Sequence, residues 1–513
     1  MSNQSMDRAA DREAVADRGE SAPSLPDLAK RALARDPARR AIEFEGVWHD
    51  WGAVRQLADS VTDLINAAGV APDAAIGLVA RSRPEMVAAL IGLVAAGRTI
   101  QMIYAFQSPT VIARDIRALK PGVVIVVAQD MTDALDCVLA EQGIAGIVLD
   151  AMAAHAAPGH AQSRIKDVAV HDMPQIEVLT SGTTGPPKRF PISFDMMARH
   201  YMGNRMMGAR HDDVEAGPPF LLFYPLGNIS GIYSTLPTML RGQPVMLLDR
   251  FSLEAWHDFV LRYRPTASGI PPSAFRMLLD ADIPREDLAS LKAMASGAAP
   301  LDPSVQRAFE ARYGIPVLMS YGATEFGGPV AAMTLELVEQ FDGAKLGSVG
   351  RPLPGARLQV VDPVTDALLP AGCEGLLEVS TPRIGQEWIR TSDIAVIDAD
   401  GFLFIRGRAD GAIMRGGFKL LPETIERALL EHPAIGAAAV VGVADTRLGQ
   451  VPGAAIQRKA GAAPLSAAEA EAHLRNHVPA THIPVHWRMV DDLPKNPSMK
   501  IDRPAVAKLF TGD

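Results

Sequence analysis

A short stretch rich in glycine and threonine, residues 180–188, holds the groups of this chain best suited to binding phosphate. Gly182 and Gly185 have no Cβ atom, so the backbone N–H groups around them can approach a ligand closely. Hydroxyl side chains add hydrogen-bond donors, and Lys188 adds a mobile positive charge. The hydroxyl residues are Thr180, Ser181, Thr183 and Thr184. Such a loop can surround the phosphates of a nucleotide, although composition alone would favour a surface turn.

The order of residues in this loop differs from that of the common phosphate loop. The common pattern is G-x-x-x-x-G-K-[ST], whereas here Gly185 is followed by two prolines and then Lys188. A phosphate-loop kinase is therefore disfavoured. Residues 175–179, directly before the loop, are expected to form a short strand.

Length and composition describe an ordinary globular chain. Its 513 residues are 48% hydrophobic and 21% charged. The formal net charge of -9 argues against a nucleic-acid partner held through its phosphates. Two cysteines, Cys137 and Cys373, cannot form a disulfide framework, and we expect both to be buried thiols. Residues 1–22 lack the apolar core of a secretory signal and are expected to be a mobile tail, and with no membrane-spanning stretch a cytoplasmic location is predicted.

Strand and helix patterns alternate along the first two thirds of the chain. This alternation predicts an α/β fold of mainly parallel sheets covered by helices, in which ligands bind at the C-terminal ends of the strands. The loop at 180–188 has this position. Strands are expected near residues 75–80, 123–127, 147–149, 220–224, 244–248, 267–270, 293–295 and 317–320, and helices near 25–33, 51–68, 84–96, 133–141, 254–263 and 303–313.

Beyond residue 351 the pattern changes to short strands separated by Gly, Pro and Asp turns, which predicts a small β-barrel-like unit. From residue 407 onward, strands and helices alternate again in a small α+β unit. We expect a large domain at 23–407 and a small C-terminal domain at 408–513, joined by a hinge.

The string Ser-Gly-Thr-Thr-Gly-x-Pro-Lys at 181–188 resembles the phosphate loop of the acyl-adenylate-forming superfamily. This superfamily comprises acyl-CoA synthetases, peptide-synthetase adenylation domains and luciferases. Further stretches resemble the superfamily in the same order and together span most of the chain. They are residues 224–231, 296–301, 321–325, 393, 407–410 and 494–503.

The resemblance implies a set of residues that bind ATP and AMP. Tyr321 would stack on adenine, Thr324 would contact the α-phosphate, Asp393 would accept hydrogen bonds from the ribose hydroxyls, and Arg408 would reach the ribose. Magnesium would be bound by Glu325 and by Thr184 of the loop, because hard Mg²⁺ prefers oxygen ligands. Other residues expected to line the nucleotide are Gly297, Ala298, Ala299, Ser320, Gly322 and Ala323.

The resemblance also implies an acyl pocket and a catalytic lysine. Lys500 would be that lysine, with Thr184 and Glu325 also catalytic, and Asp410 would be the hinge residue. The pocket would be lined by Asn228, Ile229, Ile232, Ser296, Gly297, Gly322, Phe326 and Gly327. Four positions depart from the superfamily pattern, which usually has Gly at 189 and 499, His at 228 and in many members Lys at 414. This chain has Arg189, Met499, Asn228 and Met414 there.

The implied activity is that of an ATP-dependent acid–CoA ligase using Mg²⁺, with a hydrophobic fatty or aryl monocarboxylic acid as substrate. The monocarboxylate is expected because, apart from Glu325, the candidate pocket segments 228–233, 296–300 and 320–328 contain no charged residue. Two alternatives remain open: an adenylation enzyme that loads a carrier protein, and a non-catalytic acyl or nucleotide sensor. A homodimer is possible. His473 and His477 could share a helix face and bind a metal, but no acidic third ligand follows at motif spacing, so a solvated helix is favoured.

Overall fold

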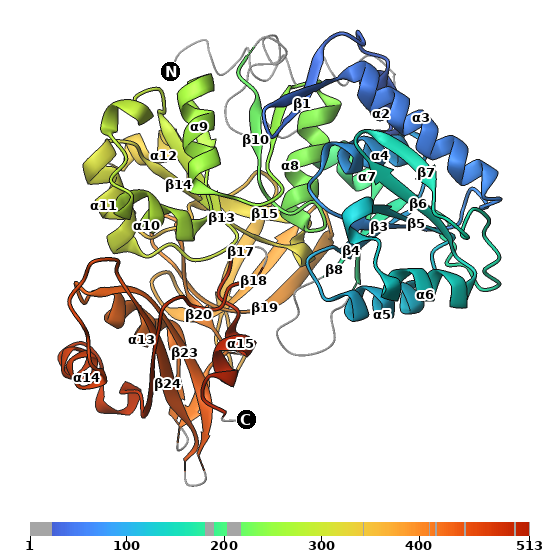
Figure 1. The fold of residues 1–513 in the computed structure, drawn as a ribbon. Helices are drawn as coiled ribbons and strands as arrows, with labels where there is room; N and C mark the ends of the chain where they lie inside the picture. The colour runs from blue at the N-terminus through green and yellow to red at the C-terminus, as the bar shows by residue number, and fades with distance from the viewer. Residues whose placement is uncertain are drawn as a thin grey trace.

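The computed structural model describes residues 23–179, 189–202, 217–341, 343–409, 411–415, 418–445, 448–496 and 499–511. Figure 1 shows a large N-terminal part, coloured blue to orange, with a smaller red part below it. Among the described residues, no helix combines the length and the apolar character needed to cross a membrane.

A seven-stranded sheet forms the first layer of the large part, with strand order β7-β6-β5-β3-β4-β8-β9. The neighbouring pairs from β6 to β8 are parallel, while β7 and β9 are antiparallel at the two edges. The strands are β3 (Ile76–Ala80), β4 (Ile100–Tyr104), β5 (Val123–Val127), β6 (Ala145–Asp150), β7 (Ala153–Ala156), β8 (Gln175–Leu179) and β9 (Arg189–Ser193). The stretch 180–188 thus connects two paired strands, since Leu179 opposes Arg189.

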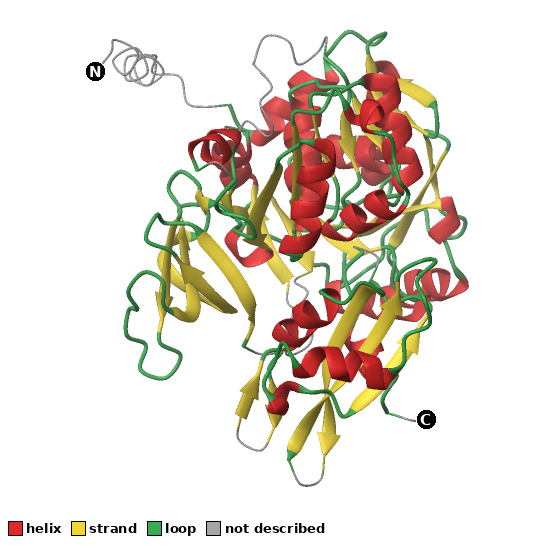
Figure 2. Cartoon of the chain, turned by 90° about the vertical axis from the view of Figure 1, so that its left-hand side faces the viewer, coloured by secondary structure: helices red, strands yellow, loops and turns green. Residues whose placement is uncertain are grey.

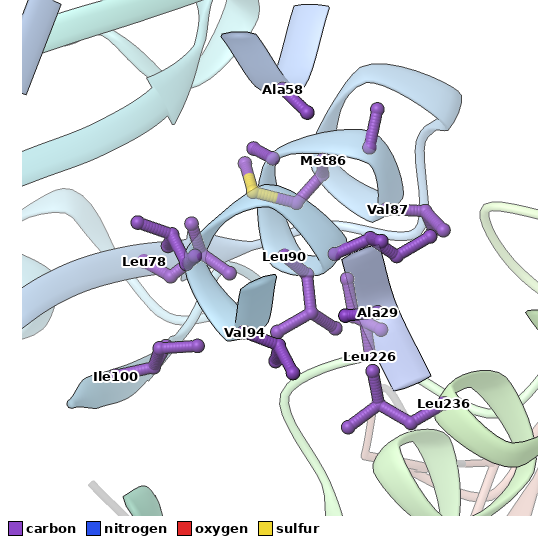
Figure 3. Packing of buried hydrophobic residues seen from close by; sticks show 14 of the residues in the cluster. Ala29, Ala58, Leu78, Met86, Val87, Leu90, Val94, Ile100, Leu226 and Leu236 are labelled. Atoms are coloured by element: carbon purple, nitrogen blue, oxygen red, sulfur yellow. The ribbon is translucent and has the colours of Figure 1, made fainter. Parts of the chain in front are cut away.

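The core of this part is built around the helix α4 (Pro84–Ala95), which is buried along its whole length. A helix with apolar residues on all sides needs neighbours on all sides. Figure 3 shows Met86, Leu90 and Val94 of α4 among side chains from other elements, including Leu78 and Leu236. The surrounding helices include α2 (Leu25–Leu33), α3 (Trp51–Ala67) and α8 (Ile229–Leu240), while α5 (Pro109–Leu119) and α6 (Asp133–Gln142) pack together elsewhere on the sheet.

A second sheet with strand order β12-β13-β14-β15-β16 completes the large part. Its first three strands are parallel, and β15 and β16 are antiparallel additions. The strands are β12 (Ala267–Gly269), β13 (Ala293–Gly297), β14 (Val317–Ala323), β15 (Gly328–Ala332) and β16 (Arg351–Pro352), and the helices near them are α9 (Leu253–Tyr263), α10 (Pro272–Asp280), α11 (Pro303–Tyr313) and α12 (Leu335–Gln340). A smaller sheet has the order β10 (Phe220–Leu222), β11 (Val245–Leu247), β1 (Arg40–Phe44) and β2 (Val47–Asp50).

Between residues 357 and 408 the strands pair antiparallel. The predicted barrel-like unit is a four-stranded sheet of β17 (Arg357–Val361), β18 (Glu374–Thr381), β19 (Gly385–Ile397) and β20 (Leu403–Arg408). Figure 2 shows this sheet and, below it, the C-terminal unit with its own sheet and helices. That unit contains β21 (Ile413–Arg415), β22 (Phe418–Leu420), β23 (Ile435–Asp445), β24 (Gly449–Arg458), β25 (His486–Val490), α13 (Pro422–Leu430), α14 (Ala467–Arg475) and α15 (Arg503–Lys508).

One arginine ties the end of the chain to the first helix of the C-terminal unit. Arg503 donates to Glu426 Oε1 at 2.8 Å and to Glu423 Oε1 at 3.2 Å, both on α13. It also donates to the carbonyl of Val440 on β23 at 2.7 Å. The segment after residue 499 therefore belongs to the same packed unit as α13 and β23.

The prediction of an α/β protein with mainly parallel sheets and a smaller C-terminal unit is confirmed. The expectation that both cysteines are buried is wrong, because Cys137 and Cys373 are exposed free thiols. Cys137 lies on α6, whose buried face is formed by Leu135, Val138 and Leu139, and points away from it. The predicted tail at 1–22 lies outside the described residues, and the boundary at residue 408 stays a prediction.

Candidate active site

The predicted phosphate loop lies outside the described residues, but both of its flanking strands are described. The residues concerned are Thr180, Ser181, Gly182, Thr183, Thr184, Gly185 and Lys188, and the predicted hinge Asp410 also lies outside. Arg189, at the start of β9, donates from Nη1 to the carbonyl of Met102 on β4 at 2.6 Å. Burial lowers the pKa of Arg189, while the carboxylates of Glu177 and Asp115 act in the opposite direction. Arg189, at a position where the superfamily usually has Gly, thus bonds β9 to β4, which lies on the other side of β8.

Two predicted adenine-binding segments meet at the C-terminal ends of the parallel strands β13 and β14. Gly297 is in register with Ser320, and the Ser320 hydroxyl donates to the carbonyl of Ser296 at 3.2 Å. A Cβ atom at Gly297 would lie 2.5 Å from Ser320 Oγ, so the close contact requires glycine. Ser296 in turn donates to the carbonyl of Ile270 at 2.8 Å. The segments 296–299 and 320–324 therefore form one continuous edge.

Tyr321 and Asp393, which are 72 residues apart in the chain, are hydrogen-bonded to each other. The Tyr321 hydroxyl donates to Asp393 Oδ2. Burial, followed by the negative charge of Asp393, holds the pKa of Tyr321 well above its ordinary value. Arg408 pairs with Asp393 in the β19–β20 register, and its Nη1 lies 3.7 Å from Asp393 Oδ1. The structure thus brings the predicted adenine and ribose residues together around one carboxylate.

Lys500 is held in a tight turn by Asn496. The Asn496 N–H donates to the Lys500 carbonyl at 2.7 Å, and the Lys500 N–H donates to Asn496 Oδ1 at 3.0 Å. Met499, within this turn, has φ of +62°, a left-handed conformation that glycine adopts more readily. Burial, and then the positive charge of Arg408, lowers the pKa of Lys500. The predicted catalytic lysine is therefore within range of the charge of Arg408, which lies at the predicted domain boundary.

Glu325 follows β14 and is exposed. Among the described residues, no cluster of three or more His, Cys, Asp or Glu side chains could bind a metal ion. A single accessible carboxylate nevertheless fits Mg²⁺, which is commonly bound by one or two carboxylates together with substrate phosphates. Glu325 remains the predicted magnesium ligand of the described chain.

The predicted acyl-pocket residues lie where α8, β15 and the end of β14 approach each other. Asn228 is the N-cap of α8, and Ile232 on the first turn is fully buried. Phe326 is buried between β14 and β15. The remaining members are Ile229, Ser296, Gly297, Gly322 and Gly327, of which Ile229 and Gly322 are half-buried and the others buried.

Sequence reasoning missed two residues next to these pocket segments. Arg383, in the turn between β18 and β19, donates from Nη1 to the carbonyl of Gly327 at 3.2 Å. Tyr201 is 1% exposed, and its ring packs edge-on against that of Tyr233 with centroids 4.9 Å apart. Neither residue belongs to a recognisable motif, and Arg383 contacts carbonyl oxygens that any sequence supplies. The sequence alone therefore gives no indication that Arg383 contacts Gly327.

Comparison with known proteins identifies the family of the chain. The family model for AMP-binding enzymes matches residues 29–387, and the model for the C-terminal domain of AMP-binding enzymes matches residues 424–500. The chain belongs to the AMP-binding enzyme family. The predicted membership of the acyl-adenylate-forming superfamily is confirmed, and so is the class of AMP-forming acid–CoA ligase.

Several curated relatives are acid–CoA ligases. The chain is 31% identical to the sulfoacetate–CoA ligase of Cupriavidus necator, over 65% of this chain and 66% of that protein, just under two thirds of it. It is 28% identical to 4-coumarate–CoA ligase 2 of Nicotiana tabacum, over 86% of each chain. Among solved structures, ATP-bound MatB from Rhodopseudomonas palustris superimposes with a TM-score of 0.78 at 22% identity, covering 95% of this chain and 99% of that one, which shows a shared fold.

Proposed function

We propose that this enzyme activates a carboxylic acid with ATP as an acyl-adenylate and then transfers the acyl group to CoA, releasing pyrophosphate and AMP. The observation that carries the proposal is that Lys500 is within range of the charge of Arg408, whose Nη1 lies 3.7 Å from Asp393 Oδ1. A lysine whose pKa is lowered by burial and by another cation is costly unless an anion joins it. The carboxylate and the α-phosphate of the two substrates supply such anions.

The first step brings a carboxylate towards a polyanion, so its barrier is largely electrostatic. Lys500 is proposed to lie between the attacking carboxylate and the α-phosphate, orienting both. The loop residues, including Lys188 and Thr184, are proposed to hold the departing pyrophosphate, and Mg²⁺ at Glu325 would neutralise charge on the triphosphate. Asp393 is proposed to accept hydrogen bonds from the ribose hydroxyls, which requires Tyr321 to share or release this carboxylate.

The second step transfers the acyl group from AMP to the thiol of CoA. The C-terminal unit, residues 408–513, is proposed to rotate about Asp410, so that Lys500 leaves and the thiol enters. Arg503 would travel with Lys500, because it is bonded to Glu423 and Glu426 within that unit. Closure of the site before transfer would also protect the mixed anhydride from water.

The acid is proposed to have a hydrophobic body, either fatty or aryl. The support is the apolar character of the candidate pocket, in which Ile232 and Phe326 are buried beside glycines. Loading of a carrier protein is the second candidate, and consumption of the adenylate by free CoA separates the two. A non-catalytic sensor is disfavoured, because pure binding gives no reason to place Lys500 next to Arg408.

The test is pyrophosphate release across a panel of carboxylic acids, with and without CoA. Lys500→Ala should lower the rate of pyrophosphate release by about 10²–10³, the usual effect of losing one transition-state contact. Supplied with synthetic acyl-adenylate, the same variant should still form the thioester. Lys495→Ala is the matched control, because Lys495 lies in the same loop and is paired with Asp492 at 3.0 Å. Near-normal adenylation by Lys500→Ala would refute the role.

A further inference from the structure

A guanidinium group with no carboxylate partner lies beside the candidate acyl pocket. Arg383 donates from Nη1 to the carbonyl of Gly327 at 3.2 Å, from Nε to Thr381 Oγ1 at 3.3 Å and from Nη2 to the carbonyl of Pro329. All three acceptors are neutral oxygens. Within the described part of the chain, no ion pair of Arg383 with Asp or Glu occurs, and burial lowers its pKa. Arg383 is half-buried, and removing much of a cation from water without a paired anion is unfavourable.

Arg383 retains donors beyond these three contacts. A guanidinium has five N–H groups, and the contacts above use one on Nε and one on each terminal nitrogen. One N–H on Nη1 and one on Nη2 remain, and guanidinium N–H groups are strong donors to a carboxylate or a similar oxyanion.

Tyr201 supplies a second donor in the same region. Its side chain is 1% exposed, and its hydroxyl has no hydrogen-bond partner among the described residues. Buried hydroxyl groups are nearly always bonded, so an unbonded one needs an explanation. The charge of Arg383 is near enough to oppose the effect of burial, which raises the pKa of Tyr201.

Arg383 borders the candidate acyl pocket. A Cβ atom at Gly328 would lie 3.2 Å from the Tyr233 ring and 3.3 Å from Arg383 Nη1, so the ring and the guanidinium face the same backbone step. Gly328 follows the pocket residue Gly327, and Tyr233 follows the pocket residue Ile232 on α8. The cation is therefore next to the region expected to receive the acid, and the ring of Tyr201 packs against Tyr233 on the same side.

We propose that Arg383 and the Tyr201 hydroxyl bind an anionic group at the far end of the acid. The substrate then carries a second carboxylate, or a similar acidic group, separated from the reacting carboxylate by a hydrophobic body. This inference rests on the proposed function and names its substrate class. It replaces the expectation of a monocarboxylate, which considered only residues within the pocket segments and omitted Arg383.

The test compares acids that differ only in the far end. The pairs are octanoate with octanedioate, and 4-ethylbenzoate with 4-(carboxymethyl)benzoate, each assayed by kcat/KM for pyrophosphate release. For at least one pair, the diacid should be preferred by about 30-fold or more, the usual effect of one desolvated charge pair. Preference for the monoacid in both pairs would overturn the inference while leaving acid activation intact. Failure of every acid to release pyrophosphate would refute acid activation and this inference together.

Single-residue variants then test whether Arg383 causes the preference for the diacid. Arg383→Met should bring the ratio of kcat/KM for the diacid to kcat/KM for the monoacid down towards unity, and an unchanged ratio would overturn the inference. Arg390→Met is the matched control, because Arg390 lies in the same sheet and is bonded to Asp366. Its diacid preference should remain.

Tyr201→Phe tests the site without disturbing the Arg383 contacts. The substitution removes only a hydroxyl that has no described partner, so the melting temperature should not fall. The diacid should lose about 5- to 10-fold in kcat/KM, as expected for one hydrogen bond to a charged group, and the monoacid should be unaffected. Equal kcat/KM values for the diacid in the variant and the parent would remove Tyr201 from the site.

Discussion

Asp393→Asn tests whether this carboxylate recognises the ribose. The substitution preserves the shape of the side chain and one carbonyl oxygen. It removes the negative charge of the carboxylate, whose Oδ1 lies 3.7 Å from Arg408 Nη1 and whose Oδ2 accepts a hydrogen bond from the Tyr321 hydroxyl. A hydrogen bond to a charged group contributes about 1.5–3 kcal/mol, and this carboxylate is expected to accept hydrogen bonds from the ribose hydroxyls. ATP should therefore bind about 10- to 150-fold more weakly to the variant, at 1.4 kcal/mol for each factor of ten.

The assay is calorimetric titration with ATP and with 2′-deoxy-ATP. The parent enzyme should prefer ATP, and Asp393→Asn should reduce this preference towards unity. Asp398→Asn is a suitable control, because Asp398 follows the same strand but is paired with Lys345 at 2.7 Å, away from the site. An unchanged ratio of the two dissociation constants in Asp393→Asn would refute the ribose contact.

Three further predictions concern the C-terminal unit. Because burial and Arg408 lower the pKa of Lys500, adenylation should decline as pH rises through that lowered pKa, before the ordinary lysine range is reached. Between the lowered pKa of folded Lys500 and the ordinary pKa of unfolded Lys500, the unfolded chain binds more protons than the folded chain. The contribution of Lys500 to the free energy of unfolding should therefore increase with pH in this range. Lys500→Met should remove this increase when unfolding is measured as a function of pH. Met499→Gly should raise the melting temperature relative to Met499→Ala, by relieving about 1 kcal/mol of left-handed strain; equal values would show that φ of +62° costs nothing. Asp410→Pro should preserve single-turnover pyrophosphate release but abolish acyl-CoA formation, since proline fixes φ; normal formation of both products would place the hinge elsewhere.

Periodic apolar patterns predicted most of the strands and helices. The helix at 25–33 and that at 303–313 have the predicted bounds, because their apolar spacing and capping residues agree. The strand β4 (Ile100–Tyr104) was missed, because Gln101 interrupts its apolar run. In the folded chain Gln101 is buried and donates to Glu177 at 3.2 Å, a tertiary contact that compensates for the polar residue.

The candidate site was predictable where chemistry requires particular residue types in a fixed local order. Tyr321, Asp393, Arg408 and Lys500 were all predicted from motifs. The first three lie together, and Lys500 is within range of the charge of Arg408. The bond between Tyr321 and Asp393 could not be predicted, because it depends on how two sheets pack. Arg383 was missed for the same reason, since its position near Gly327 depends on the turn after β18.

The bonds of Arg503 to α13 and β23 have an evolutionary consequence. Among the described residues, these bonds join elements of the C-terminal unit to one another and do not involve α8 or β15. If the acid is selected at Arg383 and Tyr201, as proposed above, substitutions there would leave the support of Lys500 unchanged. The choice of acid and the delivery of the lysine would then be separately inheritable traits of one chain.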